Sequence, residues 1–183
     1  MSMPEPDADT QITTERWRVE AELAQEKFMA PGVASREELI GKSGMEFFAG
    51  MMNGEIPPPH MTDTGDFAIV AFDYGHVVMQ GIPSVKFQNT LGIIHGGWIA
   101  TILDSVVGCA VHTTLSVGMG YATAELKVSY LRPLNVDVGL VRAEGRVISA
   151  GKKIAFAEGW LFGPDGKKYA HATTTCAVFP GAA

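Results

Sequence analysis

Asp104 stands out in this sequence because of its surroundings. It is the only formally charged side chain between Phe87 and Ala124, in a stretch rich in Ile, Val, Ala and Gly. Burying a carboxylate costs free energy unless it has partners, and carboxylates in such settings serve as general bases or nucleophiles. A helix that carries Asp104 would begin at His95-Gly96-Gly97, where unpaired backbone N–H groups can polarise a carbonyl. These residues suggest attack on a polarised carbonyl.

Two other interpretations of the apolar stretch must be weighed. Asp104 could be a structural residue that hydrogen-bonds to nearby backbone. The stretch could also be a transmembrane helix, since about 20 apolar residues span a bilayer. However, a central Asp costs about 2.5–3.5 kcal/mol on insertion scales. No cluster of Lys or Arg flanks the stretch, and four glycines interrupt it. We therefore expect a buried helix and no membrane association.

Several kinds of site lack their motifs. The sequence contains no G-x-S-x-G nucleophile motif, and neither a Walker loop nor a dinucleotide fingerprint. His60, His76 and His171 have no ligand spacing with each other or with cysteine. We interpret His112, near the end of the expected helix, as structural and favourable to the helix dipole. We expect neither a metal nor a cofactor.

Composition limits the class of protein. The 183 residues allow one domain with an extension, and 46% hydrophobic content is enough for a core. The net charge of −6 argues against nucleic acid as a partner. The acidic N-terminus does not resemble a secretory signal. Cys109 and Cys176 are isolated and are expected to be free, packed thiols, which is typical of a reducing, cytoplasmic location.

The chain divides near residue 60. Residues 1–11 are expected to form an acidic, disordered tail, and residues 12–29 an amphipathic helix. A second helix is expected over residues 35–52, because Ser35 and Glu38 fit a capping box. Three prolines at 57–59 form an extended linker. We therefore assign residues 1–60 to a tail and helical extension, and residues 61–183 to the main domain.

The main domain is expected to be α+β. Strands are predicted at 67–72, 77–82, 121–131, 136–148, 154–162 and 168–179, with one helix at about 95–114. Consecutive strands joined by tight turns pair antiparallel, and so apolar a helix must be wrapped by the sheet. The sheet's open edges favour dimerisation. Alternation along 121–131 groups Thr123 with Glu125 and Lys127, away from the helix-facing side chains.

The motifs together resemble a known family. Asn89, His95-Gly96-Gly97 and Asp104, the strand end at 126–133 and Gly151-Lys152-Lys153 are similar to the hotdog-fold thioesterases, most of all the phenylacetic-acid-degradation (PaaI) type. The similarity covers residues 55–178. It implies a curved antiparallel sheet of about six strands around one long helix. It also implies hydrolysis of an acyl-coenzyme A thioester.

The resemblance assigns roles by position. Asp104 corresponds to the family's general base or nucleophile, and Gly96 to the residue whose N–H binds the thioester oxygen. Asn89 corresponds to a polar side chain near the thioester, and Thr123 to a hydroxyl that helps to place water. In the family the site lies between two subunits, with Asn89 and Gly96 from one and Asp104 and Thr123 from the other. The partners implied are acyl-coenzyme A and a second copy, as a dimer or a dimer of dimers.

Substrate-binding residues are also expected. Within one chain, nine helical residues separate His95 from Asp104 by about 13 Å, so His95 is expected to orient the site through backbone contacts beside Gly97. Phosphates of coenzyme A need cations, for which we list Arg132, Arg146, Lys152 and Lys153. An aromatic or medium-chain acyl group would be lined by Met45, Met79, Phe87, Trp98, Met119 and Tyr121.

Two other functions stay open. A hotdog module could bind an acyl thioester or another hydrophobic ligand without turnover, because fold does not determine function. Against this, an apolar binder gains nothing from a buried carboxylate. A dehydratase or hydratase would need a His paired with an acid across the site, whereas here the helix carries Asp104 and His95 stands at its start.

Overall fold

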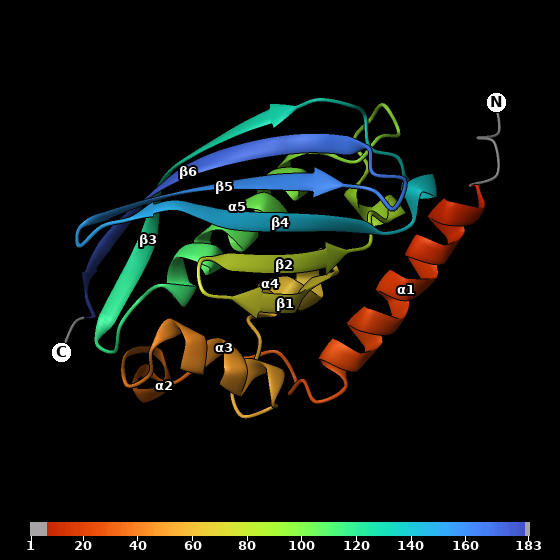
Figure 1. Cartoon of the computed structure of the whole chain (residues 1–183). Helices are drawn as coiled ribbons and strands as arrows, with labels where there is room; N and C mark the ends of the chain where they lie inside the picture. The colour runs from red at the N-terminus through yellow and green to blue at the C-terminus, as the bar shows by residue number, and fades with distance from the viewer. Residues whose placement is uncertain (1–6, 182–183) are drawn as a thin grey trace.

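The computed structural model of the protein describes residues 7–181. Six antiparallel strands form one curved sheet around the long helix α5 (Gly96–Thr113) (Figure 1). The strands are β1 (Phe67–Asp73), β2 (His76–Gly81), β3 (Met119–Tyr130), β4 (Val141–Ala150), β5 (Ile154–Phe162) and β6 (Lys168–Pro180), in the spatial order β1-β2-β4-β5-β6-β3. This is the α+β hotdog fold, as the sequence predicted.

Helix α5 provides the centre of the hydrophobic core. Ile102, Leu103, Val106 and Val107 have no exposed surface, and the sheet packs against them. Burial of that much apolar area is the main favourable contribution to folding. The ends of α5 agree with the predicted helix to within one residue. Within residues 7–181 no helix, α5 included, combines the length and hydropathy that a bilayer span requires.

Strand β3 lies at an edge of the sheet. It follows α5 in the chain, but it pairs with β6 and lies far from β4, which comes next in sequence. In the described chain, the other side of this 12-residue strand has no partner strand. The predicted strand at 136–148 begins only at Val141, because Val136–Val138 forms a short 3-10 helix.

Between residue 7 and the sheet, the structure describes four helices: α1 (Ala8–Gln25), α2 (Arg36–Ile40), α3 (Gly44–Met52) and α4 (His60–Gly65). The helix predicted at 35–52 is two helices, because Ser43 forms a second capping box with Glu46 and starts α3. Helix α4 was not predicted. Helix α1 begins at Ala8, so the expectation of disorder is wrong for residues 8–11. The first six residues of that predicted tail lie outside the described part.

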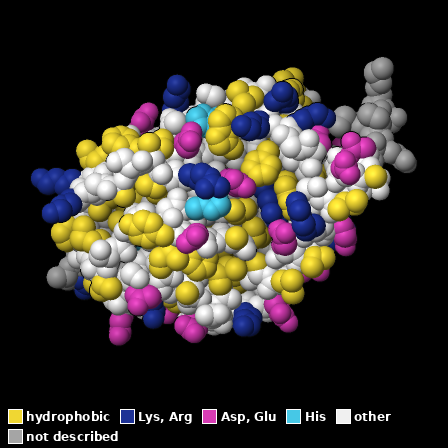
Figure 2. Space-filling view, viewed as in Figure 1, with side chains coloured by type: hydrophobic (Ala, Val, Ile, Leu, Met, Phe, Trp, Pro, Cys, Tyr) yellow, Lys and Arg dark blue, Asp and Glu magenta, His cyan; other side chains and the backbone are white. Residues whose placement is uncertain are grey.

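Helix α1 packs separately from α2 and α3 (Figure 1). Trp17 is buried against Phe162, with ring centroids 5.8 Å apart. The Arg142 guanidinium lies 4.5 Å from the Trp17 ring centroid and pairs with Glu20. Figure 2 shows charged side chains and a histidine gathered over the middle of the sheet's outer face. The opposite, inner face of the sheet packs against α5.

Candidate active site

Asp104 and Thr123 meet between α5 and β3. The Thr123 hydroxyl donates a hydrogen bond to Oδ1 of Asp104, with 3.0 Å between the oxygens. Asp104 is half-buried in the described chain, so the carboxylate is less buried than the sequence predicted. One carboxylate oxygen is oriented by a neutral donor, and the side chain still borders open space.

A β-bulge explains why Thr123 faces the helix. Thr123 pairs with Cys176 and Glu125 pairs with Thr175, so Ala124 is the extra residue on β3. Such an insertion interrupts the alternation of side chains along a strand. Leu126, beyond the bulge, packs against the core as predicted, and Thr123, before it, reaches Asp104. The predicted grouping of Thr123 with Glu125 and Lys127 is therefore wrong.

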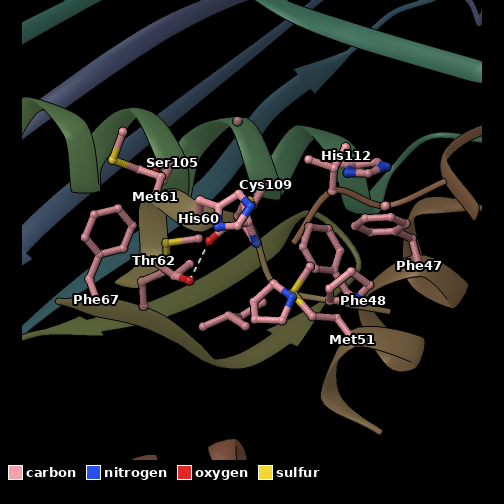
Figure 3. A pocket seen from close by; sticks show the side chains of 18 of the residues that line it. Phe47, Phe48, Met51, His60, Met61, Thr62, Phe67, Ser105, Cys109 and His112 are labelled. Carbon is pink, nitrogen blue, oxygen red and sulfur yellow. Dashed lines mark hydrogen bonds between the residues drawn. The ribbon is translucent and has the colours of Figure 1, made fainter. Parts of the chain in front are cut away.

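Asp104 and Thr123 line a largely apolar cavity of about 530 Å³, and Figure 3 shows other side chains of its wall. That volume is within the range of small-molecule sites. Helix α5 contributes one side, and β1, β2 and β3 contribute Phe67, Ile69, Met79 and Tyr121. More than half of the lining residues come from the chain before β1. The remaining lining residues are Phe28, Gly32, Val33, Ala34, Leu39, Phe47, Phe48, Met51, Pro57, Pro58, Pro59, His60, Met61, Thr62, Ser105, Gly108, Cys109 and His112.

Burial keeps several titratable groups of the cavity neutral. Burial lowers the pKa of His112 to about 4, so the imidazole is uncharged at neutral pH and the expected dipole interaction is absent. Burial, with a smaller effect of the Asp104 charge, raises the pKa of the Cys109 thiol to about 12. Burial also raises the pKa of Tyr121 well above its usual value. Cys109 is therefore a poor nucleophile. Besides Cys109, His112 and Tyr121, the titratable side chains that line the cavity are Asp104 and His60.

The start of α5 presents a backbone N–H. His95 Nδ1 accepts from the Gly97 N–H at 2.9 Å and caps the helix, and His95 O accepts from the Trp98 N–H at 3.0 Å. The Gly96 N–H has no acceptor among residues 7–181. Tyr130 packs over Gly96, where a Cβ would lie 3.0 Å from the tyrosine Cζ, and its hydroxyl donates to Gly96 O at 2.9 Å.

Asn89 holds a turn ahead of α5. Its side-chain oxygen accepts from the Leu91 N–H at 2.9 Å, and its own N–H donates to Ile93 O at 2.8 Å. This turn carries the chain back so that His95 N–H can donate to Phe87 O at 2.7 Å. In this chain, the side-chain oxygen of Asn89 therefore accepts a hydrogen bond within its own turn.

The predicted residues form two separate groups in one chain. Gly96 and Asp104 are eight helical residues apart, about 12 Å along the axis. Arg132 follows the end of β3, where its guanidinium donates to Lys168 O at 2.6 Å. Lys152 and Lys153 are exposed at the turn between β4 and β5, beside the opposite end of β6. The chain alone does not bring these cations together.

The prediction of which residues line the acyl group is partly right. Met79 and Tyr121 line the cavity, whereas Met45 and Met119 do not. Phe87 and Trp98 stack with centroids 5.4 Å apart and border a second cavity of about 370 Å³, together with His95 and Gly97. The prediction missed the aromatic residues of α3, whose only signal was a dense apolar run after Ser43.

Comparison with known proteins identifies the family. The model of the thioesterase superfamily matches residues 91–170, which include Gly96, Asp104 and Thr123. A Ralstonia eutropha structure described as a thioesterase and phenylacetic acid degradation-related protein is 33% identical, with a TM-score of 0.66. The match covers 71% of this chain and 98% of that one. A Streptococcus mutans structure bound to acetyl-CoA is 26% identical, with a TM-score of 0.57, and the match covers 62% and 89%.

Curated relatives agree over shorter stretches. A Caenorhabditis elegans protein named as an esterase is 34% identical over 105 residues, which cover 57% of this chain and 61% of that protein. A Halobacterium salinarum protein named as an esterase is 39% identical over 69 residues, covering 37% and 44%. The chain thus spans less than two thirds of the length of these two relatives. With its hotdog fold and its 33% identity over 98% of the Ralstonia eutropha chain, the chain belongs to the thioesterase superfamily.

Proposed function

We propose that the protein is an acyl-CoA thioesterase that hydrolyses an aromatic or medium-chain acyl thioester to the free acid and coenzyme A. The observation that supports this most directly is the Asp104–Thr123 pair at the wall of an apolar cavity. The apolar wall suits an acyl group, and the carboxylate suits attack on its carbonyl. The acetyl-CoA bound to the related Streptococcus mutans protein supports coenzyme A as the carrier.

Asp104 acts in one of two ways. As a general base, its carboxylate takes a proton from water while the water oxygen adds to the thioester carbonyl. The C–S bond then breaks, and the coenzyme A sulfur leaves as a thiolate that is protonated. As a nucleophile, a carboxylate oxygen adds to the carbonyl, the thiolate leaves, and water hydrolyses the resulting anhydride. In both, the Thr123 hydroxyl orients the carboxylate and helps to place water.

The proposed site needs two chains. A thioester carbonyl cannot lie against Asp104 and the Gly96 N–H of one chain, because about 12 Å of helix separates them. Strand β3 has an unpaired edge, through which a second copy can continue the sheet. We therefore propose a homodimer, or a dimer of dimers, in which Gly96 and Asn89 of one subunit face Asp104 and Thr123 of the other. The Gly96 N–H would stabilise the oxyanion.

The same pairing would gather the cations. If two β3 edges pair antiparallel, the Arg132 end of one chain lies toward the end of the other that carries Lys152 and Lys153. Positive charges from both subunits would then contact the phosphates of coenzyme A. His95 and Gly97, at the capped start of α5, would shape the backbone around the thioester.

Release of free thiol tests the function. Wild-type protein is assayed with a panel of short, medium, long-chain and aromatic acyl-CoAs, alongside Asp104→Asn. Hydrolysis of at least one class, reduced by about 10²–10⁴-fold in the variant, is the expected result. Tight binding of acyl-CoA with no hydrolysis at any chain length would instead identify the non-catalytic binding module. Addition of water to an enoyl-CoA would identify a hydratase.

A further inference from the structure

The cavity continues along α5 beyond the proposed catalytic carboxylate. Asp104, Ser105, Gly108, Cys109 and His112 line it, and their spacing places them on one face of the helix. Figure 3 shows Ser105, Cys109 and His112 following one another along the helix above the cavity. This row of cavity-lining residues, which we call the α5 stripe, is about 12 Å long from Asp104 to His112.

Helix α3 ends this stripe. Phe47, Phe48 and Met51, which we call the α3 wall, gather beneath His112 (Figure 3) and line the cavity. The ring centroids of Phe47 and Phe48 lie 4.9 Å and 5.2 Å from that of His112. All three α3 residues are buried. An acyl chain that starts at Asp104 and follows α5 therefore meets aromatic rings.

The α3 wall is held firmly against the end of α5. The Gly44 N–H donates to Leu115 O at 3.0 Å, and a Cβ on Gly44 would overlap the carbonyl of His112. Ser43 and Glu46 cap the helix start reciprocally. This close backbone contact places α3 relative to His112, so the wall is a built part of the cavity.

We propose that the α3 wall sets the length of the acyl group, with Phe48 as the specificity-determining residue; this inference rests on the proposed function. At roughly 1.2 Å per bond of an extended chain, the stripe accommodates about ten bonds. Apart from Asp104, the lining contains no Asp, Glu, Lys or Arg, and His112 is neutral. The substrate class is therefore an acyl group of medium length or an arylalkanoyl group, with an uncharged end.

The test compares chain-length profiles. The ratio kcat/KM is measured for unbranched acyl-CoAs from butanoyl to hexadecanoyl with wild type, Phe48→Ala and Phe48→Trp. One methylene in an apolar pocket changes kcat/KM by roughly tenfold or more. We expect Phe48→Ala to move the optimum to longer chains, with kcat/KM for chains longer than the wild-type optimum raised at least tenfold relative to that optimum. Phe48→Trp should move the optimum to shorter chains. A ω-carboxylated acyl-CoA of optimal length should be a poor substrate for all three.

Phe162→Ala is the matched control, because it removes an aromatic ring that packs on Trp17 outside the cavity. Its profile should equal that of wild type. If Phe48→Ala fails to fold by circular dichroism, Phe48→Leu makes a smaller opening and should shift the optimum in the same direction. Folded variants with the wild-type profile would overturn the proposal.

Binding separates this inference from the proposed function. Dissociation constants for free carboxylic acids of the same lengths are measured by calorimetry with the same variants. Should wild type hydrolyse no acyl-CoA, the proposed function fails, yet a length preference that shifts in Phe48→Ala would still support the wall. An unshifted binding preference would reject the wall whether or not hydrolysis occurs.

Discussion

The Thr123 hydroxyl donates to the Asp104 carboxylate across the gap between β3 and α5, with 3.0 Å between the oxygens. The two residues are 19 positions apart in sequence, and the β-bulge at Ala124 turns Thr123 toward the helix. A hydrogen bond to a charged carboxylate is stronger than a neutral one, and it fixes the orientation of the side chain. The bulge therefore belongs to the proposed site, since it creates the pair.

Removing the Asp104 charge should abolish most turnover without loss of the fold. Asp104→Asn keeps the side-chain shape and can still accept from Thr123, but it cannot act as a base or nucleophile. We expect a loss of about 10²–10⁴-fold in kcat, with acyl-CoA binding retained. The rate is measured by thiol release and the binding by calorimetry. A folded variant that hydrolyses at the parental rate would refute the assignment of Asp104.

Thr123 offers a matched pair of substitutions. Thr123→Val keeps the branched shape and removes the donor, whereas Thr123→Ser keeps the hydroxyl. A hydrogen bond to a charged group is worth about 1.5–3 kcal/mol, so Thr123→Val should lower kcat/KM by roughly tenfold or more. Thr123→Ser should retain most activity. Equal rates in both variants would show that the hydroxyl has no part in the reaction.

Subunit mixing tests the shared site. Asn89→Ala and Asp104→Asn chains are purified separately, each expected to be impaired, and then mixed under conditions that allow exchange. A heterodimer would contain one site with both substitutions and one with neither, so activity should recover. Exchange is confirmed by native mass spectrometry of differently tagged chains. Activity that stays at the level of the separate variants after confirmed exchange would argue for sites within single chains.

Much of the fold was predictable because its signals are local. Helix α5 has a continuous apolar pattern and a glycine-rich start, and β5 alternates over its whole length, so their ends agree with prediction. The bulge at Ala124 leaves no break in the alternation of side chains in the sequence. An unpaired residue can be identified only from the pairing with the partner strand β6. This is why Thr123 was placed on the wrong face.

The α3 wall was not predictable for a different reason. Phe47, Phe48 and Met51 show an apolar run, but their place against His112 depends on Gly44 approaching the carbonyl of that residue. Sequence spacing does not reveal contacts between elements more than 60 residues apart. The same limit explains why His112 was expected to interact with the helix dipole, although aromatic rings from α3 and β3 surround it.

Stability should fall on acidification because of His112. The imidazole packs against Phe47, Phe48 and Tyr121, and burial lowers its pKa from 6.5 to about 4. Between these values the unfolded chain binds a proton that the folded chain does not, so acidification favours unfolding. The loss begins as pH falls through 6.5 and is complete below about 4, where it reaches roughly 3 kcal/mol.

His112→Phe lacks the titrating group and should lose less stability over this window. Urea unfolding at fixed protein concentration and at pH 7, 6, 5 and 4 measures the difference, with His171→Phe as a control for a histidine on the outer face. If wild type and His112→Phe lose stability in parallel from pH 7 to 4, other groups account for the acid sensitivity and the imidazole is not held neutral.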